Sequence, residues 1–236
     1  VYAMSQGGSV GRYNTATGEQ TYIKPPAPDA TTLMRFNWNA AIAQDPFDKK
    51  TIYFGSQFLH KSTNKGASWK IISSDLTTND SAKIDQTNNG GLSVDITGAE
   101  NHCTILTIAP SSVQKDLIWI GTDDGNVQFT ANGGATWNNV TANITGLPKG
   151  AWIAQVRTST YNANEVFVVA NNYRQGDFAP YVFRTTDQGK TWTNILSAAK
   201  VTGYALTVIQ DIAEPNLFFV GTEQGMYVSL DNGVQF

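Results

Sequence analysis

The sequence has few of the residues on which disulfides, zinc sites and nucleic-acid binding depend. Its single cysteine, Cys103, rules out an internal disulfide, and its two histidines, His60 and His102, make a zinc site improbable. The 16 lysines and arginines form no run and the net charge is −3, so nucleic acid is not an expected partner. No apolar stretch reaches about 18 residues, so no membrane-spanning helix is expected.

The sequence also lacks a sustained helical period. Short apolar segments instead alternate with turns rich in glycine, asparagine and aspartate, a pattern that predicts an all-β protein. Hydrophobic residues make up 41% of the chain and charged residues 15%, enough apolar surface for a sizeable core.

One motif, [Ser/Thr]-x-[Asp/Asn]-x-Gly-x-x-[Trp/Phe], occurs four times, and we call it the corner motif. Its acidic or amide side chain can accept hydrogen bonds from its own turn, and its glycine can adopt a positive φ. Its aromatic residue begins a returning strand and can fill the space between sheets. We therefore interpret the motif as structural. The copies are Ser62, Asn64, Gly66 and Trp69; Thr130, Asn132, Gly134 and Trp137; Thr185, Asp187, Gly189 and Trp192; and Ser229, Asp231, Gly233 and Phe236.

The motifs belong to a larger repeat. The buried strands marked by Ile52, Ile118, Val166 and Leu217 are 66, 48 and 51 residues apart. A step of roughly 40–50 residues with four strands is typical of a β-propeller blade. We expect a partial blade at about 1–33, a blade with an insertion at 34–103, blades at 104–152 and 153–203, and a truncated blade at 204–236. The chain would then be a segment of a longer protein, with the remaining blades of that protein as partners.

Several segments of the chain resemble BNR or Asp-box propellers of the sortilin type, which are often labelled bacterial glycosyl hydrolases. The resemblance implies a ring of seven to ten blades and a secreted or periplasmic protein. The family includes sialidases, xyloglucanases, sorting receptors and assembly factors, so it does not fix the function. The matching segments are residues 33–39, 97–100, 121–125, 177–181 and 221–225.

Residues 33–39 contain the densest group of candidate binding residues. Arg35, Asn37, Trp38 and Asn39 offer an apolar face with donors and acceptors beside it, as a sugar-binding platform requires. The alternative is a structured turn in which Trp38 is buried. His102 is a further binding candidate, although a buried or surface histidine with a structural role is the simpler interpretation.

Two long excursions, residues 70–103 and 171–180, are the expected carriers of function. Asp95, Glu100 and Asp177 are weak candidates for a glycosidase acid or base, although nothing in the sequence fixes their separation. Arg174 is a binding candidate, or it forms an ion pair with Asp177 that orders the second excursion.

Other polar groups are interpreted as structural. Asp123-Asp124-Gly125 and Glu223-Gln224-Gly225 are expected to be hairpin turns, and calcium there would need more oxygen ligands. Cys103 has no evident catalytic partner.

Two functions fit these observations. The first is a secreted propeller that binds a protein or glycan ligand on its loop-bearing face. The second is part of a glycoside hydrolase, xyloglucanase-like or sialidase-like, whose catalytic residues are completed outside this chain; the Arg-Ile-Pro segment usual in sialidases is absent. An assembly scaffold is a third alternative. No cofactor and no metal are expected.

Overall fold

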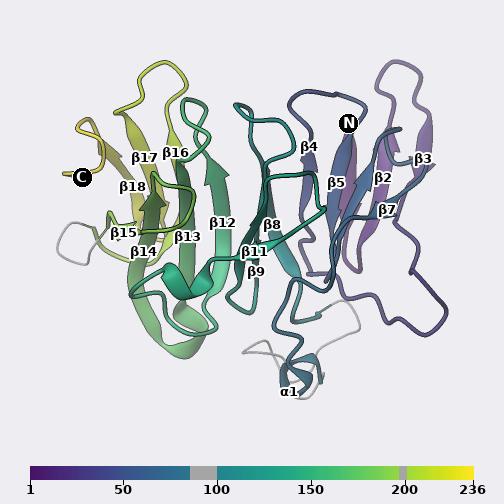
Figure 1. The fold of residues 1–236 in the computed structure, drawn as a ribbon, viewed down its shortest axis with the longest axis horizontal. Coiled ribbons are helices and arrows are strands. Elements are labelled where there is room, and N and C mark those ends of the chain that lie inside the picture. Colours follow the sequence, from purple (N-terminus) through teal and green to yellow (C-terminus); the bar gives the residue numbers. More distant parts are fainter. Residues whose placement is uncertain (86–99, 197–200) are drawn as a thin grey trace.

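The chain folds into five small antiparallel sheets that stand side by side in chain order (Figure 1). The computed structural model describes residues 1–85, 100–196 and 201–236. Three sheets have four strands and two have three, which confirms the predicted all-β class. Within the described ranges, no helix combines the length and apolarity that a membrane span needs.

Each sheet runs in simple up-and-down order. The first sheet contains β1 (Tyr2–Ser5), β2 (Ser9–Tyr13) and β3 (Gln20–Tyr22). The second contains β4 (Ile42–Gln44), β5 (Ile52–Gly55), β6 (Leu59–Ser62) and β7 (Lys70–Ile71). The third contains β8 (Ile105–Pro110), β9 (Ile118–Thr122), β10 (Val127–Thr130) and β11 (Asn138–Asn139). The fourth contains β12 (Trp152–Thr158), β13 (Val166–Asn172), β14 (Asp177–Thr185) and β15 (Thr193–Asn194). The fifth contains β16 (Ala205–Gln210), β17 (Phe218–Thr222) and β18 (Gly225–Ser229).

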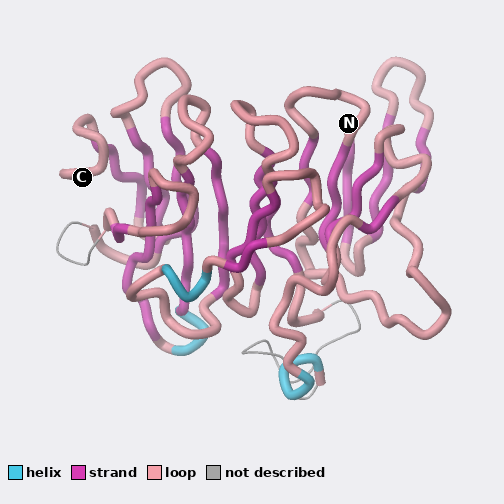
Figure 2. The backbone as a smooth tube through the Cα atoms, viewed as in Figure 1, coloured by secondary structure: helices cyan, strands magenta, loops and turns pink. Residues whose placement is uncertain are grey.

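The helical segments lie in connections between strands (Figure 2). They are α1 (Ser81–Ile84) and the 3-10 turns η1 (Thr141–Asn143) and η2 (Tyr173–Gln175).

An aromatic side chain fills the same place in three successive sheets. Tyr53 in β5, Trp119 in β9 and Phe167 in β13 each occupy the second position of the strand that pairs with the one leading into a corner motif. Each is almost completely buried, and each packs into the hydrophobic cluster shared with the following sheet. Burying one such side chain stabilises the fold by about 1.5–3 kcal/mol. The sheets are therefore held to one another by apolar contacts between their faces.

Each corner motif closes on itself through the same three hydrogen bonds. In the third copy, Gly189 N donates to Thr185 Oγ1 at 3.0 Å, and that hydroxyl donates to Asp187 Oδ1 at 2.8 Å. Thr191 N donates to the same Asp187 oxygen at 2.9 Å. The other three copies repeat all three bonds. Hydrogen bonds to the Asp187 carboxylate, of which those from Thr191 contribute most, lower the pKa of Asp187 to about 2. The motif's polar atoms are thus engaged within the turn.

The glycine of each corner motif also lies against the preceding sheet. Gly66, Gly134, Gly189 and Gly233 have φ values of 87°, 101°, 83° and 85°. A Cβ on Gly134 would stand 2.5 Å from the carbonyl oxygen of Ile72, the residue that follows β7. Three further residues that follow an outer strand occupy the same place beside the other corner glycines: Ile23, Val140 and Ile195.

In the first two copies, the motif's tryptophan adds a hydrogen bond to this contact between sheets. Trp69 Nε1 donates to the carbonyl oxygen of Ile23 at 2.7 Å, and Trp137 Nε1 donates to that of Ile72 at 2.9 Å. Because Ile23 follows β3 as Ile72 follows β7, strands β1–β3 match the second to fourth strands of the next sheet.

Gly134→Ala tests the contact between sheets against a matched control. Gly146 also has a positive φ of 87°, but a Cβ there would meet nothing within 4 Å. Both substitutions cost about 1–2 kcal/mol for the left-handed backbone. Gly134→Ala adds about 1–3 kcal/mol of overpacking, because a backbone oxygen cannot rotate away. Urea denaturation followed by tryptophan fluorescence measures both variants, and equal losses of stability would refute the contact.

Candidate functional site

A groove of about 450 Å³ lies where loops of the second, third and fourth sheets approach the first strands β8, β12 and β16. Three segments supply most of its polar groups: residues 37–39 before β4, residues 100–101 before β8, and the β13–η2 connection. The floor residues on the first strands are apolar. The lining residues are Asn37, Trp38, Asn39, Glu100, Asn101, Leu106, Trp152, Ala154, Asn171, Tyr173, Arg174 and Leu206.

Aromatic rings give the groove its shape. Trp38 is 53% exposed, so the alternative in which it is buried in a turn is wrong. The Arg174 guanidinium carbon lies 3.4 Å from the ring centroid of Trp152 and 4.4 Å from that of Tyr173. Tyr173 in turn stacks on Tyr204 with centroids 4.5 Å apart. The groove thus presents an open indole face beside a guanidinium that aromatic rings hold in place.

The expected ion pair between Arg174 and Asp177 does not form. Asp177 instead accepts hydrogen bonds from Asn172 Nδ2, the Tyr181 hydroxyl and Ala179 N, at 3.2, 2.8 and 3.1 Å. Strand β14 already begins at Asp177, so much of the predicted 171–180 excursion is strand rather than loop. Asp177 does not line the groove, because its contacts hold it within the β13–β14 hairpin.

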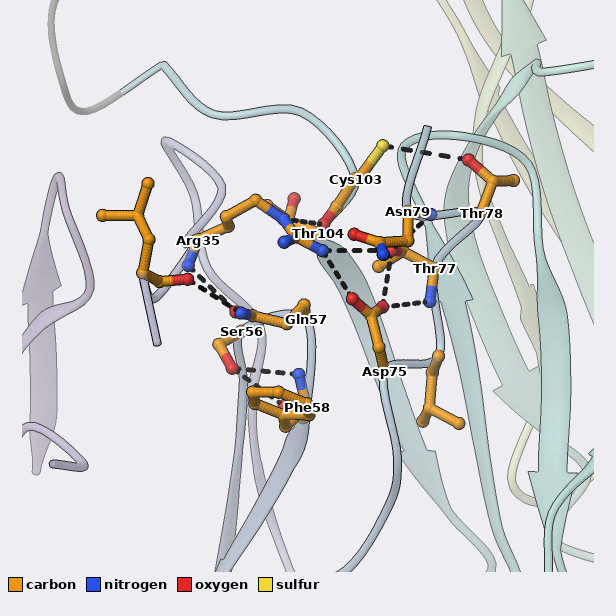
Figure 3. Close-up of polar contacts among 12 residues, drawn as sticks. Arg35, Ser56, Gln57, Phe58, Asp75, Thr77, Thr78, Asn79, Cys103 and Thr104 are labelled. Carbon is orange, nitrogen blue, oxygen red and sulfur yellow. Dashed lines mark hydrogen bonds and ion pairs between the residues drawn. The ribbon is translucent and has the colours of Figure 1, made fainter. Parts of the chain in front are cut away.

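Arg35 anchors the loop that carries Trp38. Figure 3 shows the polar contacts of Arg35. Its guanidinium forms an ion pair with Asp75 at 2.7 Å and donates to the carbonyl oxygen of Cys103 at 3.2 Å. Its backbone N–H donates to Gln57 Oε1 at 2.9 Å. Arg35 is 8% exposed and does not line the groove. The structure therefore places this predicted binding residue behind the platform that it supports.

A buried carboxyl group lies behind Asn37. Asp123 follows β9 and is fully buried. Its Oδ1 accepts from Thr104 N at 2.8 Å, and its Oδ2 accepts from the Thr104 hydroxyl at 2.5 Å and from Asn37 Nδ2 at 3.0 Å. Burial and then the adjacent Asp124 raise the pKa of Asp123 to about 7. The sequence predicted a hairpin turn here, but it did not predict that the turn's side chains would be internal.

Asp124, His102 and Cys103 complete the polar layer beneath the groove. Asp124 accepts hydrogen bonds from Thr78 and from the Thr122 hydroxyl. Burial lowers the pKa of His102 to about 4 and raises the pKa of Cys103 to about 12, so both are neutral near pH 7. Across residues 1–85, 100–196 and 201–236, no three His, Cys, Asp or Glu side chains are grouped to hold a metal ion.

The structure brings together five of the residues proposed from the sequence: Asn37, Trp38, Asn39, Glu100 and Arg174 line the groove. His102 lies beneath it, with its ring 6.2 Å from that of Trp152. Asp95 lies outside the described residues. The contributors that the sequence did not single out include Trp152 and the buried Asp123, whereas Asn171 and Tyr173 lie within the predicted 171–180 excursion.

The raised pKa of Asp123 predicts a specific dependence of stability on pH. In the unfolded chain this carboxyl ionises near pH 4, whereas in the folded protein it ionises near pH 7. The stability that it contributes is therefore full below pH 4 and is lost as the pH rises to about 7.

The difference in unfolding free energy between wild type and Asp123→Asn should accordingly fall between pH 4 and pH 7 in urea denaturation. Asp187→Asn is the control of opposite sign, because the lowered pKa of Asp187 gives stability that is lost as the pH falls toward 2. A difference for Asp123→Asn that is constant with pH would contradict the assignment.

Comparison with known proteins identifies the fold. No protein-family model matches the chain, and no curated protein matches its sequence. An ancestral GH74 enzyme is similar in structure, with a TM-score of 0.58 and 19% identity over 87% of this chain and 25% of that chain. The GH74 xyloglucanase from Xanthomonas campestris gives a TM-score of 0.59 and 13% identity, over 88% of this chain and 31% of that chain.

A third similar structure is the extracellular domain of a hybrid two-component system protein from B. thetaiotaomicron. Its TM-score is 0.52 and its identity 15%, over 84% of this chain and 24% of that chain. The chain thus spans about a quarter to a third of the length of the structures it matches. At these identities the likeness shows the fold alone, and that fold is a set of β-propeller blades.

Proposed function

We propose that the groove binds a glycan chain, and that the protein is a carbohydrate-binding propeller of the Asp-box type. The observation that carries this proposal is Trp38, which is 53% exposed at the edge of a groove lined with side-chain amides. A sugar ring has an apolar face of C–H groups, which packs on an aromatic ring, and a rim of hydroxyls, which need donors and acceptors.

The remaining lining fits the same ligand. Asn39, Asn101 and Asn171 offer amides to hydroxyl groups, and Arg174 offers guanidinium N–H groups from its place over Trp152. Leu106, Ala154 and Leu206 supply an apolar floor. These groups come from the second to the fifth sheet, so a chain of several sugars fits better than a single small metabolite. An extended protein loop could use the same groove and is the competing ligand.

Two likenesses support the Asp-box type of propeller and the glycan ligand in this proposal. The four closed corner motifs have the residue spacing of Asp boxes, and two of the similar structures are GH74 enzymes. The third is described as an extracellular domain, which is consistent with a secreted or periplasmic protein. Xyloglucan is accordingly the first glycan to try.

Glycoside hydrolysis is the second candidate function, and Glu100 favours it. Glu100 lines the groove, whereas Asp177 is held in the β13–β14 hairpin. Hydrolysis needs two carboxyl groups, about 5–5.5 Å apart in retaining enzymes and about 6.5–9.5 Å apart in inverting ones. Among the described lining residues Glu100 is the one carboxylic acid, so a partner carboxyl would have to come from elsewhere in the protein.

Trp38→Ala tests glycan binding. We expect the variant to bind xyloglucan oligosaccharides at least about tenfold more weakly than wild type in isothermal titration calorimetry, a loss of about 1.4 kcal/mol. Tyr22→Ala is the matched control, because Tyr22 is 66% exposed on β3 and does not line the groove. Equal weakening by both substitutions, or by neither, would count against the groove.

Glu100→Gln separates binding from hydrolysis. If Glu100 is a catalytic acid or base, the substitution lowers the rate of xyloglucan cleavage by a factor of about 100 or more and leaves binding nearly unchanged. Asp177→Asn is the control, and it should leave the rate intact. Cleavage should be assayed by reducing-end release; if it is undiminished in Glu100→Gln, this role for Glu100 is wrong.

A further inference from the structure

We propose that Asp123 is a positioning residue: through Asn37 it holds Trp38 where the groove needs it, and protonation of its carboxyl loosens that hold. This inference rests on the proposed binding function, which it deepens by adding a dependence on pH. Asp123 itself lies beneath the groove and does not line it.

The connection from Asp123 to Trp38 is a short series of hydrogen bonds. Asp123 Oδ2 accepts from Asn37 Nδ2 at 3.0 Å. Asn37 Oδ1 then accepts from Asn39 N at 3.1 Å, which closes a turn around Trp38. Asn37 is 4% exposed, so its amide orientation is set by these internal partners. The exposed indole thus follows a buried side chain, Asn37, which is anchored on Asp123 and Thr104.

The hydrogen-bond donors around Asp123 favour an ionised carboxylate. Thr104 N and Asn37 Nδ2 can only donate, and the Thr104 hydroxyl also donates to Asp123. A protonated carboxyl would bring a fourth hydrogen into a site where every partner already supplies one. The Thr104 hydroxyl can turn to accept that hydrogen and still accept from Asn37 Nδ2 at 3.2 Å, because its oxygen has two lone pairs. A neutral carboxyl oxygen is, however, a weaker acceptor for Asn37 Nδ2 than a carboxylate oxygen. Protonation therefore weakens the anchor of Asn37.

The groups around Asp123 set the pH at which its carboxyl is protonated. Asp124, from the same turn, adds a like charge, whereas Arg174, from η2, adds an opposite one. On the segment before β8, His102 and Cys103 are neutral near pH 7. Arg35, on the segment before β4, is paired with Asp75. Burial and Asp124 dominate, and they raise the pKa of Asp123 to about 7. The hydrogen bond that Asn37 donates to Asp123 should therefore strengthen as the pH rises through 7.

The test is the affinity for a xyloglucan oligosaccharide, measured by calorimetry from pH 5.5 to 8.5. Wild type should bind more tightly as the pH rises, with a midpoint near 7. Asp123→Asn, whose amide resembles the protonated carboxyl, should bind weakly at every pH. Asp124→Asn keeps the hydrogen bond that Asn37 donates to Asp123 but removes the like charge, so its midpoint should move to lower pH. A flat wild-type profile, or an Asp124→Asn midpoint equal to that of wild type, would overturn the inference.

A measurement without ligand separates this inference from the proposed function. The side-chain amide resonances of Asn37 should shift with the same midpoint in the NMR spectra of the unliganded protein, and Asp123→Asn should abolish the shift. If the resonances titrate while no oligosaccharide binds, the positioning role stands and the binding function fails. If the oligosaccharide binds while the resonances do not titrate, the positioning role fails. Should Asp123→Asn not fold, Asp124→Asn carries both measurements.

Discussion

The structure depends on the contact between each corner glycine and the residue that follows the last strand of the preceding sheet. A four-stranded sheet cannot bury both faces by itself, so each one relies on its neighbours. At Gly66 and Gly134 a single added carbon would meet Ile23 or Ile72 within 2.6 Å. The glycine thus has two constraints, a positive φ and no room for a side chain, and the motif satisfies both. The hydrogen bonds inside each corner fix the turn, and the glycine contact fixes the distance between sheets.

The groove follows from this stacking. Because the sheets are held face to face, first strands β8, β12 and β16 lie beside one another and offer Leu106, Ala154 and Leu206 as an apolar floor. The loops that enter these strands then meet above that floor. Here the protein buries Arg35 and Asp123, and polar partners satisfy both, with Asp75 paired to Arg35. This buried polar layer supports the turn that carries the exposed indole of Trp38.

Much of the fold could be predicted from the sequence because its signals are local. The corner motif contains its own hydrogen-bonding partners, so Asp187 and Gly189 predict a turn whatever the rest of the chain does. The groove could be predicted only in part. Trp38 and Asn37 are adjacent in sequence, but Trp152 and Arg174 meet through the pairing of β12 with β13, which no short motif encodes. The turn at Asp123 could be predicted, but the burial of its side chain could not, because its partner Asn37 lies 86 positions away in the sequence.

A crystal structure of the protein with a bound xyloglucan oligosaccharide tests the central claim most directly. The account predicts a sugar ring stacked on Trp38, with hydroxyl groups within hydrogen-bonding distance of Asn39 or Arg174 and no shift of the Asn37 side chain. Sugar bound elsewhere, with the groove filled by solvent, would contradict it.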